Sequence, residues 1–155
     1  RAHKYVHIMT PYLILDGEME TALKFAAERG VDVKLILPGI PDKRAAYALA
    51  KSHYRSLLDS GVRIYEYTPG FVHAKLFVSD DREGVVGTIN LDYRSLYHHF
   101  ECAAYLYGVP CLADMEADYQ ATLEQCRTVT YETLKAEPWG RKLLGCIMKV
   151  VAPLM

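Results

Sequence analysis

The chain has 155 residues, of which 51% are hydrophobic and 24% are charged, and its formal net charge at pH 7 is −1. This length suffices for one ordinary domain with a sizeable core, and the composition excludes a disordered chain. Because a dedicated nucleic-acid binder usually carries clustered Lys and Arg, the near-neutral charge makes nucleic acid a disfavoured partner.

The first half of the chain alternates between strand-like and helix-like patterns of apolar residues. The expected elements are a strand at Tyr5–Met9, a helix at Asp16–Arg29, a strand at Val31–Leu37, a helix that Asp42 caps and that runs to about Asp59, and a strand at Val62–Tyr67. The connections are short enough for parallel crossovers, so this half predicts a β-α-β-α-β unit.

The second half begins with consecutive strands that have no helix between them. We expect strands at Phe71–Ser79, Val85–Ile89 and Glu101–Tyr107, with a polar turn at Asp80–Gly84. Such strands pair antiparallel, so the sheet should be mixed. A helical stretch from Pro110 to about Lys135 and a basic amphipathic segment at residues 141–155 complete one α/β (α+β) domain that covers residues 1–155.

The most informative residues are His73 and Lys75, which are two positions apart on a predicted strand and therefore project to one face. An imidazole beside an ammonium is unusual as core packing. The positive charge pushes the histidine toward its neutral form, and only the neutral ring has the free lone pair of a nucleophile. Asp80 follows at the start of the polar turn.

Polar side chains downstream complete a predicted phosphodiester site. Thr88 and Asn90 place a hydroxyl and an amide at the end of the next strand, where they and Lys75 can donate to phosphate oxygens. Glu101 opens the following strand and is suited to hold the second ring nitrogen of His73, which would fix the tautomer and stabilise a phosphohistidine.

The pattern His73-x-Lys75-x-x-x-x-Asp80, followed by Gly87-Thr88-Ile89-Asn90, resembles the HKD motif of the phospholipase D superfamily. Bacterial cardiolipin synthases are similar over nearly the whole chain, through the segments Ile8–Tyr12, Arg29–Val33, Gly61–Tyr67, Asn90–Ser95 and His99–Glu101. The pattern is that of the second of two HKD halves. Thr88 departs from the serine of many members but keeps the hydroxyl.

The resemblance implies a phospholipase D-like domain and a ping-pong phosphatidyl transfer. One HKD histidine attacks a phosphatidyl donor, the other half's histidine serves as general acid and then base, and two phosphatidylglycerol molecules give cardiolipin and glycerol. His73 can be either histidine. Neither a metal nor another cofactor is implied. The implied partners are a second HKD half or a homodimer mate, and a membrane surface.

Several interpretations stay open. Asp80 can belong to the catalytic set, as its place in the HKD motif implies, or can serve a turn or a salt bridge. Ser95 can bind a substrate oxygen or the active-site loop, or cap a helix, and Glu101 can be a plain surface charge. Cys102 with His98 and His99 can be imagined as a zinc site, although the spacing fits no common one. The apolar face of the basic C-terminal segment can lie on anionic lipid or pack against the parent chain's other half.

The beginning of the chain at Arg1, close to a strand-like segment, suggests a piece of a longer protein. No apolar run approaches the roughly 20 residues that span a bilayer. We therefore expect a membrane anchor, if present, in an N-terminal part of the parent, with this domain on the cytoplasmic side. The competing functions are a homodimeric HKD nuclease or phosphodiesterase, and a catalytically silent half that serves as a docking module.

Overall fold

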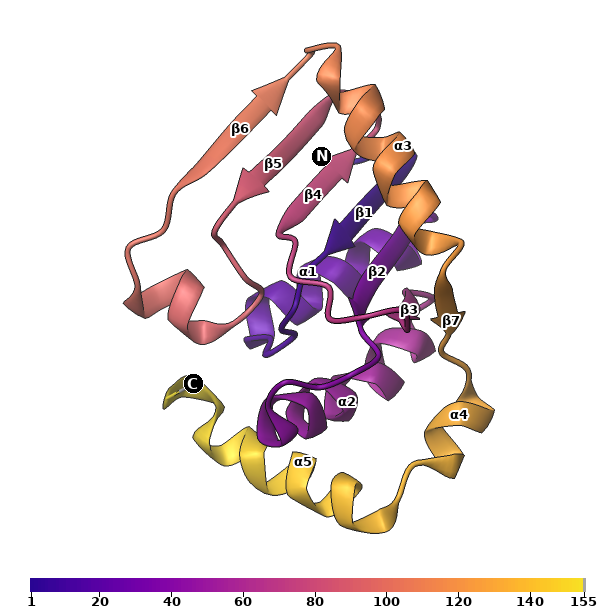
Figure 1. The fold of residues 1–155 in the computed structure, drawn as a ribbon, viewed down its shortest axis with the longest axis vertical. Helices are drawn as coiled ribbons and strands as arrows, with labels where there is room; N and C mark the ends of the chain where they lie inside the picture. The colour runs from indigo at the N-terminus through magenta and orange to yellow at the C-terminus, as the bar shows by residue number, and fades with distance from the viewer. Residues whose placement is uncertain (155) are drawn as a thin grey trace.

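A computed structural model describes residues 1–154, and residue 155 of the C-terminal segment lies outside the described residues (Figure 1). Seven strands form one mixed sheet in the order β6-β5-β4-β1-β2-β3-β7. The strands are β1 (Tyr5–Met9), β2 (Asp32–Pro38), β3 (Arg63–Tyr67), β4 (Leu76–Ser79), β5 (Glu83–Gly87), β6 (Ala103–Tyr107) and β7 (Cys126–Thr128). The helices are α1 (Gly17–Glu28), α2 (Arg44–Asp59), α3 (Cys111–Leu123), α4 (Tyr131–Ala136) and α5 (Trp139–Val151), with a π-helical turn at Arg94–His98 and a 3-10 turn at Ala152–Leu154.

The first half of the chain forms the predicted parallel unit. β1 pairs with β2 and β2 with β3, both in parallel, and α1 and α2 make the crossovers. The Asp16 carboxylate caps α1 by accepting a hydrogen bond from the Met19 backbone at 2.7 Å. The prediction that Asp42 caps α2 is wrong, because the N-cap is Lys43 and the Asp42 carboxylate accepts a hydrogen bond from the Tyr12 hydroxyl instead.

The strands of the second half pair antiparallel, as expected. β4 lies between β1 and β5, and β5 pairs with β6. The turn between β4 and β5 contains Asp80 and Asp81, whose φ angles are 54° and 55°. Aspartate tolerates this left-handed conformation better than most side chains, which explains the acidic turn.

The predicted strand Phe71–Ser79 is too long, because only Leu76–Ser79 pairs with neighbouring strands. Met9, the last residue of β1, is the partner of Leu76, and Pro11 follows shortly after. The residues before Leu76 therefore have no β1 neighbour. β5 likewise ends at Gly87 and β6 begins at Ala103, so Thr88, Asn90 and Glu101 lie just outside the strands.

The single predicted helix from Pro110 to about Lys135 is also wrong. α3 ends at Leu123, and the chain then forms β7 against β3 before α4 begins. The pairing is reinforced by Arg127, whose guanidinium donates to the Glu66 carboxylate at 2.5 Å. This strand pairing overrides the local helical pattern.

The two faces of the sheet bury separate cores. Ile8 and Leu35 pack under α1 and α2, whereas Met9 and Ile36, one residue further along the same strands, pack under α3. Figure 1 shows α3 crossing one face of the sheet, with α1 on the other. This alternation is the period-two pattern of a sheet covered on both sides.

A buried ion network joins β3 to α2 and to the segment after α4. Glu66 is 1% exposed, and its carboxylate contacts the Lys51 ammonium at 2.5 Å and accepts a hydrogen bond from the Tyr54 hydroxyl at 3.2 Å. Lys51 also contacts Glu137 at 2.8 Å. Burial alone would lower the pKa of Lys51, but these two carboxylates outweigh burial and raise it, so the buried lysine keeps its charge.

The C-terminal helix α5 packs along α2, at the side of the molecule remote from β6 (Figure 1). The contact requires Gly145, because a Cβ added there would lie 2.4 Å from the Ala48 carbonyl oxygen of α2. Across residues 1–154, none of the helices combines the length and the apolar character needed to cross a membrane.

Candidate active site

One edge of the molecule gathers the start of β4, the end of β5 and the start of β6, because these three strands run antiparallel to one another. The Gly87 backbone donates a hydrogen bond to the Lys75 carbonyl at 3.3 Å, and the Thr88 backbone donates to the Cys102 carbonyl at 3.0 Å. Lys75, Thr88 and Glu101 are thereby brought to the same edge, as the sequence predicts.

His73 and Lys75 contact each other directly. The Lys75 ammonium lies 3.0 Å from Nδ1 and 3.2 Å from Nε2 of the His73 ring, and it donates to the His73 carbonyl at 2.7 Å. A hydrogen bond from the ammonium to the ring requires a ring nitrogen with a lone pair, the same feature that a nucleophile needs. Burial lowers the pKa of Lys75, whereas the charges of Glu101 and Asp92 act in the opposite direction.

Glu101 contacts Thr88 rather than His73. The Thr88 hydroxyl donates to the Glu101 carboxylate and accepts from the Cys102 backbone at 3.0 Å. This hydroxyl, followed by the nearby Ser95 hydroxyl, holds the pKa of Glu101 below its usual range, and the charges of His99 and Lys75 act in the same direction. Among residues 1–154 no hydrogen bond joins Glu101 to His73, so the role of Glu101 as the orienting carboxylate stays a prediction.

The close packing of β5 against β6 explains why the Gly-Thr-x-Asn segment begins with a glycine, Gly87. A Cβ at this position would lie 2.3 Å from the Cys102 carbonyl oxygen and 2.5 Å from the Ala103 Cα. Only glycine therefore allows β5 and β6 to approach closely enough for Thr88 to meet Glu101.

Asn90 and Ser95 carry polar atoms whose hydrogen-bonding capacity is unused. The Asn90 Oδ1 and the Ser95 hydroxyl oxygen are buried. The Asn90 Oδ1 has no hydrogen-bond partner within residues 1–154, and the Ser95 hydroxyl makes no well-aligned hydrogen bond there, although it lies close enough to the Glu101 carboxylate to lower the pKa of that group. Buried polar atoms without partners are rare in folded proteins, and their explanations include a catalytic role and a bound water or ion. The helix-capping alternative for Ser95 is wrong, because the Asp92 carboxylate caps this turn by accepting from the Ser95 backbone at 2.7 Å.

Asp80 lies at the opposite end of β4 from His73 and Lys75. Its carboxylate accepts hydrogen bonds from the backbone of His3 at 2.8 Å and from the backbones of Lys4 and Tyr5 at 2.9 Å. Burial alone would raise the pKa of Asp80, but these three donors outweigh it and hold the pKa below the usual range. The contacts support the structural interpretation of this residue.

We expect Asp80→Asn to destabilise the fold by about 1–2 kcal/mol at pH 7, because a neutral amide replaces a partly exposed carboxylate that accepts three hydrogen bonds. The folded pKa is depressed, so this stability is present above the unfolded pKa of about 3.9 and is lost as the pH falls through the folded value. Urea denaturation at pH 7 and at pH 3 should show a difference from wild type that shrinks at the lower pH.

Asp81→Asn is the matched control, because Asp81 has the same left-handed backbone but its carboxylate accepts a single hydrogen bond within residues 1–154, from the Tyr5 hydroxyl. Its effect should be smaller. A loss of catalytic activity of a hundredfold or so in Asp80→Asn, with unchanged stability, would place Asp80 in the chemistry instead.

The structure adds residues to which the sequence assigned no role. Asp92 is buried, and its carboxylate accepts a hydrogen bond from the Ser95 backbone at the start of the π-helical turn. Its charge also acts on the Lys75 ammonium. The spacing of three residues between Asp92 and Ser95 is a capping signal that is visible in the sequence. His7 and His53 are buried structural residues. Their Nδ1 atoms lie 2.9 Å from the Glu116 carboxylate and 3.0 Å from the Glu20 carboxylate.

The zinc interpretation of His98, His99 and Cys102 finds no support in the geometry. Within the described part of the chain, no three His, Cys, Asp or Glu side chains are placed to hold a metal ion. His98 instead pairs its Nε2 with the Pro153 carbonyl at 3.1 Å.

A sequence profile for the family described as "Cardiolipin synthase, PLD-like domain" matches residues 1–123. The chain belongs to this PLD-like family. A cardiolipin synthase of Alkalihalophilus pseudofirmus is 35% identical over 154 residues, which cover 99% of this chain and 31% of that protein. An uncharacterized protein of Streptococcus mutans is 64% identical over 155 residues, which cover the whole of this chain and 34% of that protein.

Solved structures show the same fold. The phosphatidylserine synthase of Haemophilus influenzae superposes with a TM-score of 0.79 at 20% identity, over the whole of this chain and 42% of that one. This PLD-like chain therefore has the fold of the phospholipase D superfamily, as expected, and it spans about a third of the length of the curated relatives named above.

Proposed function

We propose that this PLD-like chain is the second catalytic half of a phosphatidyltransferase that forms cardiolipin and glycerol from two phosphatidylglycerol molecules. The observation that carries the proposal is the contact between the Lys75 ammonium and the His73 ring, beside the Thr88–Glu101 pair. The membership of a cardiolipin synthase family supports the choice of a lipid substrate.

In the proposed first step, a His73 ring nitrogen attacks the phosphorus of one phosphatidylglycerol. A phosphorus–nitrogen bond forms, the bond from phosphorus to the glycerol oxygen breaks, and the glycerol oxygen takes a proton from the histidine of the other half. Lys75 is placed to donate to the phosphate oxygens and to offset the charge of the transition state. Asn90 and Ser95, with their buried unused atoms, are candidates to hold the substrate.

In the proposed second step, the histidine of the other half removes a proton from a hydroxyl of a second phosphatidylglycerol. The resulting oxygen nucleophile attacks the phosphorus, the phosphorus–nitrogen bond breaks, and cardiolipin leaves. His73 and the other histidine can exchange these roles without changing the overall reaction. The reaction as proposed takes place at a membrane surface and requires two HKD motifs that face each other.

The test compares the full-length protein that contains this chain with the 155-residue chain alone. Both are incubated with phosphatidylglycerol vesicles without added metal, and cardiolipin and glycerol are measured by mass spectrometry. We expect equal amounts of both products from the full-length protein and almost none from the isolated chain. Release of phosphatidic acid without cardiolipin would contradict the transferase. Rapid turnover by a verified monomer of the isolated chain would contradict the need for a second motif.

A further inference from the structure

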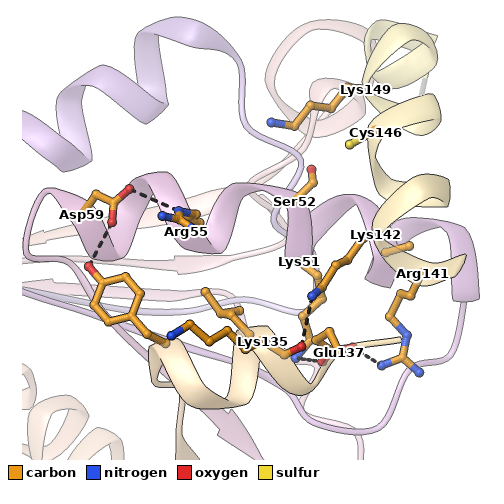
Figure 2. A pocket seen from close by; sticks show the side chains of 13 residues that line it. Lys51, Ser52, Arg55, Asp59, Lys135, Glu137, Arg141, Lys142, Cys146 and Lys149 are labelled. Carbon is orange, nitrogen blue, oxygen red and sulfur yellow. Dashed lines mark hydrogen bonds and ion pairs between the residues drawn. The ribbon is translucent and has the colours of Figure 1, made fainter. Parts of the chain in front are cut away.

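A cavity lies between α2, α4 and α5, away from the residues of the candidate active site (Figure 2). Its volume is about 620 Å³, within the range of small-molecule pockets. Six basic side chains and two carboxylates line it: Lys51, Arg55, Lys135, Arg141, Lys142 and Lys149, with Asp59 and Glu137.

The carboxylates near the cavity satisfy only some of these cations. Lys51 and Arg141 contact Glu137 at 2.8 and 2.5 Å, and Arg55 makes a loose pair with Asp59 at 3.8 Å. Three ammonium groups remain that have no carboxylate partner among residues 1–154: those of Lys135, Lys142 and Lys149. The cavity therefore carries more positive charge than its carboxylates neutralise.

These ammonium groups come from two helices that face α2. Lys135 belongs to α4, and Lys142 and Lys149 belong to α5 and lie one on each side of Cys146 (Figure 2). The Lys142 ammonium donates to the Lys135 backbone carbonyl at 3.1 Å, which ties α5 to the end of α4. Ammonium groups that line a cavity can donate hydrogen bonds to the oxygens of a phosphate.

The outer side of α5 carries an exposed apolar stripe. Its residues recur at intervals of three or four and continue into the final turn: Trp139, Leu143, Ile147, Val150 and Leu154. Trp139 is 76% exposed and Val150 is 82% exposed. At ideal helical spacing the stripe lies opposite Gly145, the contact with α2, and Lys142 and Lys149 lie between the two sides.

We propose that this cavity and stripe, here called the α5 face, bind the surface of a membrane that contains anionic phospholipid. A lipid phosphate occupies the cavity, and Ile147 and Val150 enter the boundary between headgroups and acyl chains. A soluble polyanion would leave the apolar stripe exposed to water, and an apolar protein surface would leave the charges of the three ammonium groups uncompensated. An anionic lipid surface satisfies both features.

Binding of the purified protein to vesicles tests this proposal, and the readout does not depend on catalysis. The double variant Lys135→Glu/Lys149→Glu should bind vesicles of phosphatidylcholine with anionic lipid at least about 30-fold more weakly, because each basic residue at an anionic surface adds several-fold. Its matched control is Lys4→Glu/Arg44→Glu, which has the same net charge but alters exposed residues outside the cavity. The control should bind nearly as well as wild type.

The apolar half of the α5 face has its own variant. Val150→Glu should weaken binding about tenfold or more, because it places a charge where an exposed apolar side chain would be buried. Since Val150 is largely exposed, the variant should retain the thermal stability of wild type, which circular dichroism measures. Unchanged vesicle binding in Val150→Glu or in the lysine double variant overturns the proposal.

Cysteine footprinting locates the contact. Cys146 lines the cavity and is exposed, whereas the exposed Cys111 at the start of α3 serves as an internal control. Anionic vesicles should slow alkylation of Cys146 several-fold and leave Cys111 unchanged, as measured by mass spectrometry. Equal protection by phosphatidylcholine alone or by inorganic phosphate overturns the lipid assignment. The same conclusion follows if the variants change self-association in lipid-free buffer and leave vesicle binding unaltered.

Discussion

His73→Ala in the full-length protein is expected to reduce cardiolipin formation by a factor of about 10⁴ or more if His73 is the nucleophile, and by about 10²–10⁴ if it is the general acid and base. The loss follows from the position of the ring against the Lys75 ammonium at the edge where Thr88 meets Glu101. Initial rates of cardiolipin release, measured against added phosphatidylglycerol, check the size of the effect.

The two roles of His73 are separated by trapping. A denaturing quench during turnover, followed by mass spectrometry of the peptide that contains His73, should detect a phosphatidyl adduct only if this ring attacks phosphorus. His3→Ala is the control, because His3 is exposed at the Asp80 end of the sheet. Normal cardiolipin formation by His73→Ala would refute any catalytic role for the residue.

Glu66→Ala is expected to cost about 3–5 kcal/mol of unfolding free energy, the largest effect on stability predicted for this chain. The substitution removes the carboxylate that contacts the buried Lys51 ammonium at 2.5 Å and the Arg127 guanidinium at 2.5 Å. Arg127 is largely exposed and can turn to solvent, whereas Lys51 would retain only Glu137. Chemical denaturation monitored by circular dichroism measures the change.

Two comparisons isolate the cause of that loss. Glu124→Ala removes an exposed carboxylate and should change stability by less than about 0.5 kcal/mol. The pair Glu66→Leu with Lys51→Met removes both buried charges and should recover much of the loss, because no uncompensated charge is left. A loss below about 1 kcal/mol in Glu66→Ala would show that the folded protein tolerates the Lys51 charge without the Glu66 carboxylate.

The sequence predicts the parallel half of the fold well because its signals are local. Apolar spacing marks α1 and α2, and the left-handed Gly30 and Gly61 end them. The errors occur where a distant strand decides the structure. β7 forms because β3 has a free edge with which it pairs. β4 begins only at Leu76 because its partner strand β1 ends at Met9, opposite Leu76.

In the candidate site too, local sequence signals predict one part of the arrangement, and long-range packing decides the rest. The motif spacing predicts that Lys75, Thr88 and Glu101 come together, since antiparallel neighbours share an edge. The hydrogen-bond partner of Glu101 and the buried, unused oxygens of Asn90 and Ser95 depend on side-chain packing, which the sequence does not encode locally. The sequence indicates the basic and apolar character of the C-terminal segment, but not the cavity beside it, because the contact of Gly145 with Ala48 joins residues nearly a hundred positions apart.

The order of the strands also has a consequence for how the protein assembles. β1, β2 and β3 can pair once the first 67 residues have been synthesised. β4 pairs with the other edge of β1, although β2 and β3 lie between these two strands in the sequence. β4, β5 and β6 then add as neighbouring antiparallel strands, joined by a tight turn between β4 and β5 and by the longer segment 88–102 between β5 and β6. The β1–β4 pairing attaches this group to the parallel half, with α3 lying across the join. The buried bridge between Leu13 and Leu91 and the contacts of Asp80 with residues 3–5 add further attachments. The edge that carries His73 and Lys75 is therefore anchored to the parallel half at several places, and we expect the two to unfold as one cooperative unit.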